Sequence, residues 1–160
     1  MAVGHEPTKA ARPRAVGVMV LDNEGVSKAA TDRAMYVRLK VAYEEGHRVV
    51  TSAAILAEIL RGGTRDAAVH RVLARVGVEP VSEAIGQQAG HLIGAAGMAS
   101  EQAVDAMVAA TAIEAAEQAE AAGQAASVLI ITSDMPHLTR LVAGRTGIAV
   151  ANVSKLGSAR

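Results

Sequence analysis

The chain has 160 residues, enough for one domain with a substantial core, and this length gives no reason to expect a second domain. It carries 16 basic and 16 acidic side chains, so no global charge attracts nucleic acid, although a local basic rim around an acidic site is compatible with neutrality. The absence of cysteine excludes disulfides, thiolate zinc sites and cysteine nucleophiles, and with aromatic residues at only 1% the core must be built from Ala, Val, Leu, Ile and Met.

The first predicted element is a strand at residues 16–22, in which four apolar residues in a row precede Asp22. A run of this kind, β-branched and too short for a good helix, is typical of a strand buried on both faces of a parallel sheet. Further strands are predicted at residues 47–52, 127–132 and 148–153. Residues 78–81 are either a connector or a brief extended piece that Pro80 keeps out of a sheet interior.

Helices are expected between these strands, at residues 27–45, 53–61, 65–76, 83–96, 101–122 and 135–143. The first is amphipathic over its whole length, and Gly46 follows it as a C-terminal stop. The fifth is the longest and is dominated by Ala. Strands that alternate with helices predict an α/β fold, with a mainly parallel central sheet covered by helices on both faces.

The single domain is predicted to span residues 16–153, after a flexible N-terminal extension at 1–15 and before a polar C-terminal tail at 154–160. The extension contains basic residues but no apolar segment that could serve as a signal peptide. The longest apolar run is far below the roughly 18 residues that a membrane helix needs. Together with the absence of cysteine, these features predict a cytoplasmic protein without a membrane segment.

Four carboxylates stand out by their positions in these elements. Asp22 and Asp134 each end an apolar strand, at the edge of an α/β sheet where ligands gather. Glu58 and Asp105 interrupt apolar helical stretches, and a buried acid there must be paired, protonated or bound to a metal. Each acid also has a structural explanation. Asp22 can cap the following helix, Glu58 can pair with Arg61, and the dipole of its helix stabilises Asp105.

The segments that contain these acids resemble, in their order and spacing, the motifs of PIN domains, and within them those of VapC-type toxin ribonucleases. They are VLD at residues 20–22, SAAILAEILRG at 52–62, VDAMVAATA at 104–112 and ITSD at 131–134. The resemblance places the acidic catalytic quartet of that family on Asp22, Glu58, Asp105 and Asp134. It implies a PIN-like domain and a metal-dependent endoribonuclease of a toxin–antitoxin module.

The implied site needs a divalent cation, because two like charges about 4 Å apart repel by roughly 4 kcal/mol at an effective dielectric constant of 20. Oxygen donors suit Mg²⁺, with Mn²⁺ as a substitute, whereas zinc would want His or Cys nearby. The resemblance implies Asp22, Asp105 and Asp134 as metal ligands, directly or through water. Glu58 would orient water or a second ion. Metal-activated water would then hydrolyse an RNA phosphodiester and leave a 5′-phosphate and a 3′-hydroxyl.

Neighbouring residues are predicted in supporting roles. Thr132, which matches a hydroxyl position of the family, and Ser133 are candidates to support the metal ligands through hydrogen bonds. Arg61 is a candidate contact for RNA phosphate or for an antitoxin, with a solvated ion pair as an equal alternative. Glu24 either neighbours the metals or begins the next helix. His137 stands where close relatives often place a further acid, and we favour a surface histidine at a helix start over a phosphate contact.

The resemblance also implies partners, namely an RNA substrate, a small antitoxin protein and a second copy of the chain in a homodimer. Two other functions stay open. A catalytically silent PIN-like module would bind RNA or protein without cleaving, and it would show no Mn²⁺-dependent stabilisation or cleavage. A phosphatase of another α/β family is disfavoured, because Asp22 lacks the DxD arrangement of the common aspartate-nucleophile phosphatases.

Overall fold

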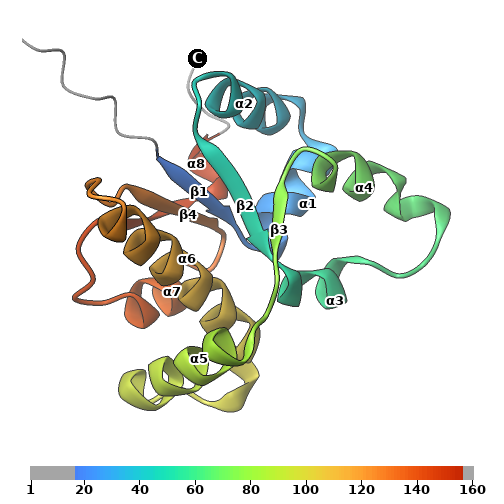
Figure 1. Ribbon diagram of the computed structural model, residues 1–160. Helices are drawn as coiled ribbons and strands as arrows, with labels where there is room; N and C mark the ends of the chain where they lie inside the picture. The colour runs from blue at the N-terminus through green and yellow to red at the C-terminus, as the bar shows by residue number, and fades with distance from the viewer. Residues whose placement is uncertain (1–16, 157–160) are drawn as a thin grey trace, which may run out of the picture.

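The computed structural model describes residues 17–156, whose strands form one parallel sheet in the order β3-β2-β1-β4-β5 (Figure 1). The predicted N-terminal extension lies outside the described residues. The strands are β1 (Val18–Leu21), β2 (Arg48–Ser52), β3 (Gly77–Glu79), β4 (Val128–Thr132) and β5 (Ile148–Asn152). The two most continuous apolar runs of the sequence, β1 and β4, pair with each other at the centre, with Leu21 opposite Ile131. The predicted α/β fold is thereby confirmed.

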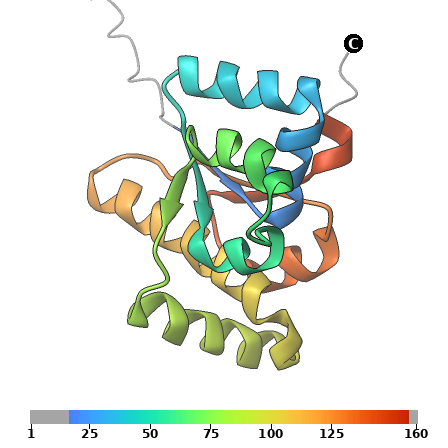
Figure 2. The ribbon, with the colours of Figure 1, turned by 90° about the vertical axis from the view of Figure 1, so that its right-hand side faces the viewer.

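Helices cover both faces of this sheet (Figures 1 and 2). They are α1 (Asn23–Thr31), α2 (Arg33–Glu44), α3 (Leu56–Ile59), α4 (Ala67–Leu73), α5 (Glu83–Ala96), α6 (Ala103–Ala121), α7 (Met135–Leu141) and α8 (Val153–Leu156). On one face α6 packs against β1, β2 and β4, with α5 and α7 beside it. On the other face α1 packs against β1 and β4, with α2 and α4 against α1. In both views α2 and α5 lie at opposite ends of the molecule.

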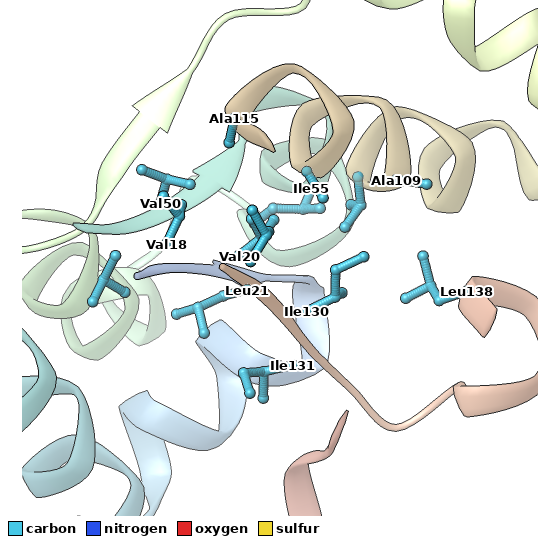
Figure 3. Packing of buried hydrophobic residues seen from close by; sticks show 14 of the residues in the cluster. Val18, Val20, Leu21, Val50, Ile55, Ala109, Ala115, Ile130, Ile131 and Leu138 are labelled. Carbon is cyan, nitrogen blue, oxygen red and sulfur yellow. The ribbon is translucent and has the colours of Figure 1, made fainter. Parts of the chain in front are cut away.

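The core follows from the alternation of side chains along the central strands (Figure 3). Val20 and Ile130 face α6, and Leu21 and Ile131 face α1, and none of the four is exposed to solvent. The α6 face that meets the sheet is made largely of Ala, so the helix can approach the strands closely without aromatic side chains. The carboxyl-terminal edge of the sheet is therefore fixed in position by the packing of both helical layers.

The long helix predicted at residues 27–45 is two helices, and that prediction was wrong. The chain breaks at Asp32, which has extended backbone angles and whose side chain accepts a hydrogen bond from the backbone N–H of Met35 at 3.1 Å. Asp32 also forms an ion pair with Lys28 across the break, at 3.3 Å. An N-cap inside a continuous helical pattern lets α2 turn away from α1 while both keep apolar faces inward.

Three further boundaries differ from the predictions. The segment after β2 begins as a 3-10 turn at Ala53–Ile55 before the short helix α3, and another such turn at Thr64–Asp66 precedes α4. The segment at residues 78–81, for which a connector or a brief extended piece was predicted, overlaps the edge strand β3, and Pro80 directly follows that strand. The first residues assigned to the polar tail belong instead to α8, and residues 157–160 lie outside the described part. No helix in residues 17–156 is long and apolar enough to cross a membrane.

Candidate active site

The sheet order places the topological switch point of the sheet at the carboxyl ends of β1 and β4. The chain leaves β1 toward β2 on one side, and β4 lies on its other side, so strand order reverses between β1 and β4. In open α/β sheets this switch point is where ligands bind. Asp22 directly follows β1, and Asp134 follows β4 by one intervening residue, so both residues lie at this point.

Asp22 is held rigidly at the start of α1. Its Oδ1 accepts a hydrogen bond from the backbone N–H of Gly25 at 2.8 Å, and its own N–H donates to the carbonyl of Ile131 at 3.2 Å. Its side chain is only 3% exposed. Burial, followed by the charges of Asp105 and Glu24, raises its pKa from 3.8 to about 6 against the lowering effect of its hydrogen bonds. Asp22 therefore caps α1, as its structural explanation predicted, and it also lies at the candidate site.

Thr132 links the two strand ends. Its buried hydroxyl hydrogen-bonds to the Asp22 carboxylate, and the same oxygen accepts from the backbone N–H of Asp134 at 2.8 Å. A hydroxyl can donate once and accept at the same time, which a Val of the same shape cannot do. Thr132 thus sets the position of Asp134 relative to Asp22.

Asp105, Asp134 and His137 form a tight group. Each offers one ligand atom, and these atoms all lie within 4.8 Å of one another. Asp105 comes from the first turn of α6, while Asp134 caps α7 and His137 lies in the first turn of that helix. The Nδ1 atom of His137 is 2.5 Å from Oδ2 of Asp134. Burial and the charge of Asp134 raise the pKa of Asp105, and the charge of His137 opposes that shift.

Glu58 and Glu24 complete the set on the side of α3 and α1. Glu58 is exposed on α3, which packs against α1. Partial burial and the charges of Asp105 and Glu24 raise the pKa of Glu58. Glu24 begins the next helix, as one of its two alternatives predicted, because it lies in the first turn of α1, and its charge also acts on Asp22. Its position beside a metal stays a prediction.

We call these five carboxylates, Asp22, Glu24, Glu58, Asp105 and Asp134, the acidic cluster. Within residues 17–156 no lysine or arginine forms an ion pair with any of them, and His137 is the basic side chain in contact. Like charges about 4 Å apart repel by a few kcal/mol per pair unless a cation lies among them. Burial first, and then the charges of neighbouring carboxylates, raise the pKa values of Asp22, Glu58 and Asp105.

The remaining predicted residues lie at the edge of the cluster. Arg61 is exposed and donates from its guanidinium to the carbonyls of Ala57 and Leu60, at 3.1 and 2.8 Å, so it caps the end of α3 and does not pair with Glu58. Ser133 is exposed, and none of the hydrogen bonds found in the described part of the chain involves its hydroxyl. Their proposed roles toward RNA and metal stay predictions.

The structure brings all four members of the predicted quartet to one edge of the sheet, but it groups them unevenly. Asp105 and Asp134 share their tight group with His137, whereas Asp22 is buried, is outside that group, and accepts hydrogen bonds from backbone and hydroxyl donors. Sequence reasoning underrated His137. The signal was its spacing, since a residue three positions after a helix cap lies over that cap.

No protein-family model and no curated protein sequence matches the chain. Among solved structures, it is similar to VapBC2 from Rickettsia felis bound to a DNA fragment from their promoter. The TM-score is 0.58 at 13% identity, over 84% of this chain and 98% of the other. It is also similar to VapBC-1 from nontypeable Haemophilus influenzae, with a TM-score of 0.52 at 15% identity, over 86% and 98% of the two chains.

At these identities the likeness concerns the path of the backbone. It extends over 98% of each of the two solved chains. The chain therefore has an α/β PIN-like fold, the fold found in these VapBC structures.

Proposed function

We propose that this protein is a metal-dependent endoribonuclease of the VapC toxin type. The observation that carries the proposal is the acidic cluster, which joins carboxylates from four separate segments at the switch point of a PIN-like fold. Carboxylates gathered without lysine or arginine partners, as these are within the described part of the chain, are an arrangement that a divalent cation stabilises.

The donor set fits such a cation. Asp105 and Asp134 offer carboxylate oxygens whose spacing, within 4.8 Å, allows one ion to contact both. Both side chains are partly exposed, which leaves room for the waters that Mg²⁺ and Mn²⁺ retain. When bound, the cation would supply positive charge that activates water as a nucleophile and stabilises charge on the phosphate oxygens.

The chain's own residues would divide the remaining work. Asp22 and Thr132 hold the strand ends together, so the Asp134 carboxylate keeps its direction toward Asp105. Glu58, exposed at the rim and raised in pKa, is placed to orient water or accept a proton near the phosphodiester. Hydrolysis by water would leave a 5′-phosphate and a 3′-hydroxyl.

The partners follow from the same proposal. The solved structures of this fold are VapBC assemblies, which supports a small antitoxin as the protein partner of this chain. RNA would be the substrate, with Arg61 at the rim as a phosphate contact, and a homodimer is the proposed assembly. The cytoplasmic location stays a prediction.

The test is cleavage of a 5′-labelled single-stranded RNA with Mg²⁺ or Mn²⁺ and with EDTA. We expect divalent-dependent cleavage with 5′-phosphate ends, reduced about a hundredfold or more in Asp105→Asn, the scale on which damaged metal sites lose activity. Asp32→Asn is the matched control, because Asp32 caps a helix outside the cluster and should leave cleavage unchanged. Equal cleavage by wild type and Asp105→Asn would refute the assignment of the site.

The silent PIN-like module is separated by the same experiment. If the protein shows neither Mn²⁺-dependent stabilisation nor Mn²⁺-dependent cleavage, the silent module is favoured and the proposed metal site is refuted.

A further inference from the structure

His137 is the nitrogen donor closest to the proposed metal position. It lies in the first turn of α7, and its ring forms one corner of the group with Asp105 and Asp134. We infer that His137 is a direct ligand of the divalent cation, and that its nitrogen shifts the ion preference of the site from Mg²⁺ toward first-row transition ions such as Mn²⁺ and Co²⁺. This inference rests on the proposed metal site.

The geometry allows both donors of α7 to reach one ion. Adjacent ligands of an octahedral ion at about 2.1 Å lie roughly 3 Å apart. The observed separation of Nδ1 and Oδ2 is 2.5 Å, so an ion between them requires an opening of about half an ångström. The side chains of His137 and Asp134 are 39% and 42% exposed, so small χ rotations can open the pair without disturbing the core.

Asp105 closes the triangle from a different helix. It projects from the first turn of α6, and α6 packs against α7, so the third donor does not depend on the same turn of chain. These three donors from two packed segments would hold the cation and leave it open to water and to a phosphate oxygen. Asp22 and Glu58 would act on the far side, as acceptors for the waters.

The chemical class of the ion follows from the donor set. Mg²⁺ prefers oxygen donors and is bound through carboxylates and water, whereas an imidazole nitrogen suits transition ions. Two oxygens and one nitrogen therefore favour Co²⁺ and, less strongly, Mn²⁺ over Mg²⁺. An all-carboxylate site on the same backbone would lose this bias.

The competing explanation is that His137 only orients Asp134. In that case its ring nitrogen hydrogen-bonds the carboxylate and contributes no bond to the ion. Replacing His137 would then weaken all ions to a similar extent. A direct ligand predicts that Mg²⁺ and Co²⁺ respond in opposite directions.

The experiment compares wild type, His137→Asp and the control His91→Asp by isothermal titration with Mg²⁺, Mn²⁺ and Co²⁺ at one fixed pH. Asp is well tolerated in a first helical turn, so His137→Asp should fold. We expect the ratio of Co²⁺ to Mg²⁺ affinity to fall about tenfold or more in His137→Asp. His91 is an exposed residue of α5 outside the site, and its variant should match wild type.

A second readout detects the bond itself. Pulsed electron paramagnetic resonance of the Mn²⁺ complex should show coupling to an imidazole nitrogen in wild type and His91→Asp, and none in His137→Asp. If the nitrogen coupling is absent in wild type and the affinity ratio does not change, His137 is not a ligand, while RNA cleavage by the same samples would leave the proposed nuclease intact. If no ion binds at all, both the ligand and the metal-dependent function are refuted.

Discussion

Replacing Asp22 by Asn should make the metal-free protein more stable at neutral and alkaline pH. The folded carboxyl has a pKa of about 6, against 3.8 for the ordinary group, so the folded state binds this proton more tightly than the unfolded state does. The stability that comes from the protonated form is complete below pH 3.8 and is lost as pH rises through 6. Above pH 7 the ionised Asp22 therefore costs about 3 kcal/mol, at roughly 1.4 kcal/mol per pH unit.

Asn removes that cost and keeps the structural role. It is as good an N-cap as Asp, and its carbonyl oxygen can accept from the N–H of Gly25, as Oδ1 of Asp22 does now. Urea unfolding followed by far-ultraviolet circular dichroism in EDTA measures the effect, since the chain has no Trp for fluorescence. We expect Asp22→Asn to be more stable by about 2 to 3 kcal/mol at pH 8, with the gain vanishing near pH 4.

Asp32→Asn provides the opposite sign in the same fold. Asp32 also caps a helix, but a backbone hydrogen bond from Met35 and its contact with Lys28 lower its pKa. Its stabilising effect is present above the unfolded pKa and is lost as pH falls through the lowered value. This variant should therefore lose stability at pH 8. A gain for Asp22→Asn that is equal at pH 4 and pH 8, or no gain at all, would refute the reasoning.

Three further predictions concern the same edge of the sheet. Thr132→Val removes the acceptor of the Asp134 N–H and a hydrogen-bond donor to Asp22, so the free energy of unfolding at pH 8 should fall by about 1 to 2 kcal/mol. An unchanged free energy of unfolding in urea would contradict the role of Thr132 in linking Asp22 to Asp134. Gly25→Ala would place a Cβ 3.2 Å from the carbonyl oxygen of Ile131, which is fixed in the sheet, so we expect the free energy of unfolding to fall by about 1 kcal/mol. A more stable variant would show that α1 has room to move. Millimolar Mn²⁺ should raise the melting temperature of wild type in differential scanning calorimetry and have much less effect on Asp105→Asn, and equal shifts in both would place the ion elsewhere.

The parts of the fold that could be predicted are those in which local pattern and tertiary environment agree. The strands β1 and β4 are apolar except for Thr132 at the end of β4, because both faces of a central parallel strand are covered. The break at Asp32 could not be predicted in the same way, since apolar residues keep their helical spacing across it. An Asp inside a helical pattern becomes a cap only when the two halves pack on different neighbours, and that information lies in the contacts of α1 and α2.

The site shows the same division. Strand ends identify Asp22 and Asp134 from the sequence alone, because parallel strands finish at a common edge. The approach of Glu58 and Asp105 depends on how α3 and α6 pack around α1 and the sheet. Their apolar surroundings in the sequence made them candidates, and the resemblance to known motifs joined them to Asp22 and Asp134. His137 was predicted to be a surface residue, and its half-exposed ring fits that description while also contacting Asp134.

The order of the strands explains why the acidic cluster is both costly and available. β1 lies at the centre of the sheet, and the strands on its two sides end at the same edge as β1 does. Carboxylates that are far apart in sequence therefore meet at this edge, outside the core. Burial and, after it, their mutual repulsion raise the pKa of Asp22, Glu58 and Asp105, and both a proton and a cation relieve that repulsion. At neutral pH protons are scarce, and the same repulsion that lowers the stability of the metal-free protein therefore increases its affinity for a divalent ion. Variants that neutralise a carboxylate of the cluster should become more stable without metal and should bind the divalent ion more weakly. A variant that gains stability but keeps its ion affinity would show that the carboxylates do not serve to hold a cation.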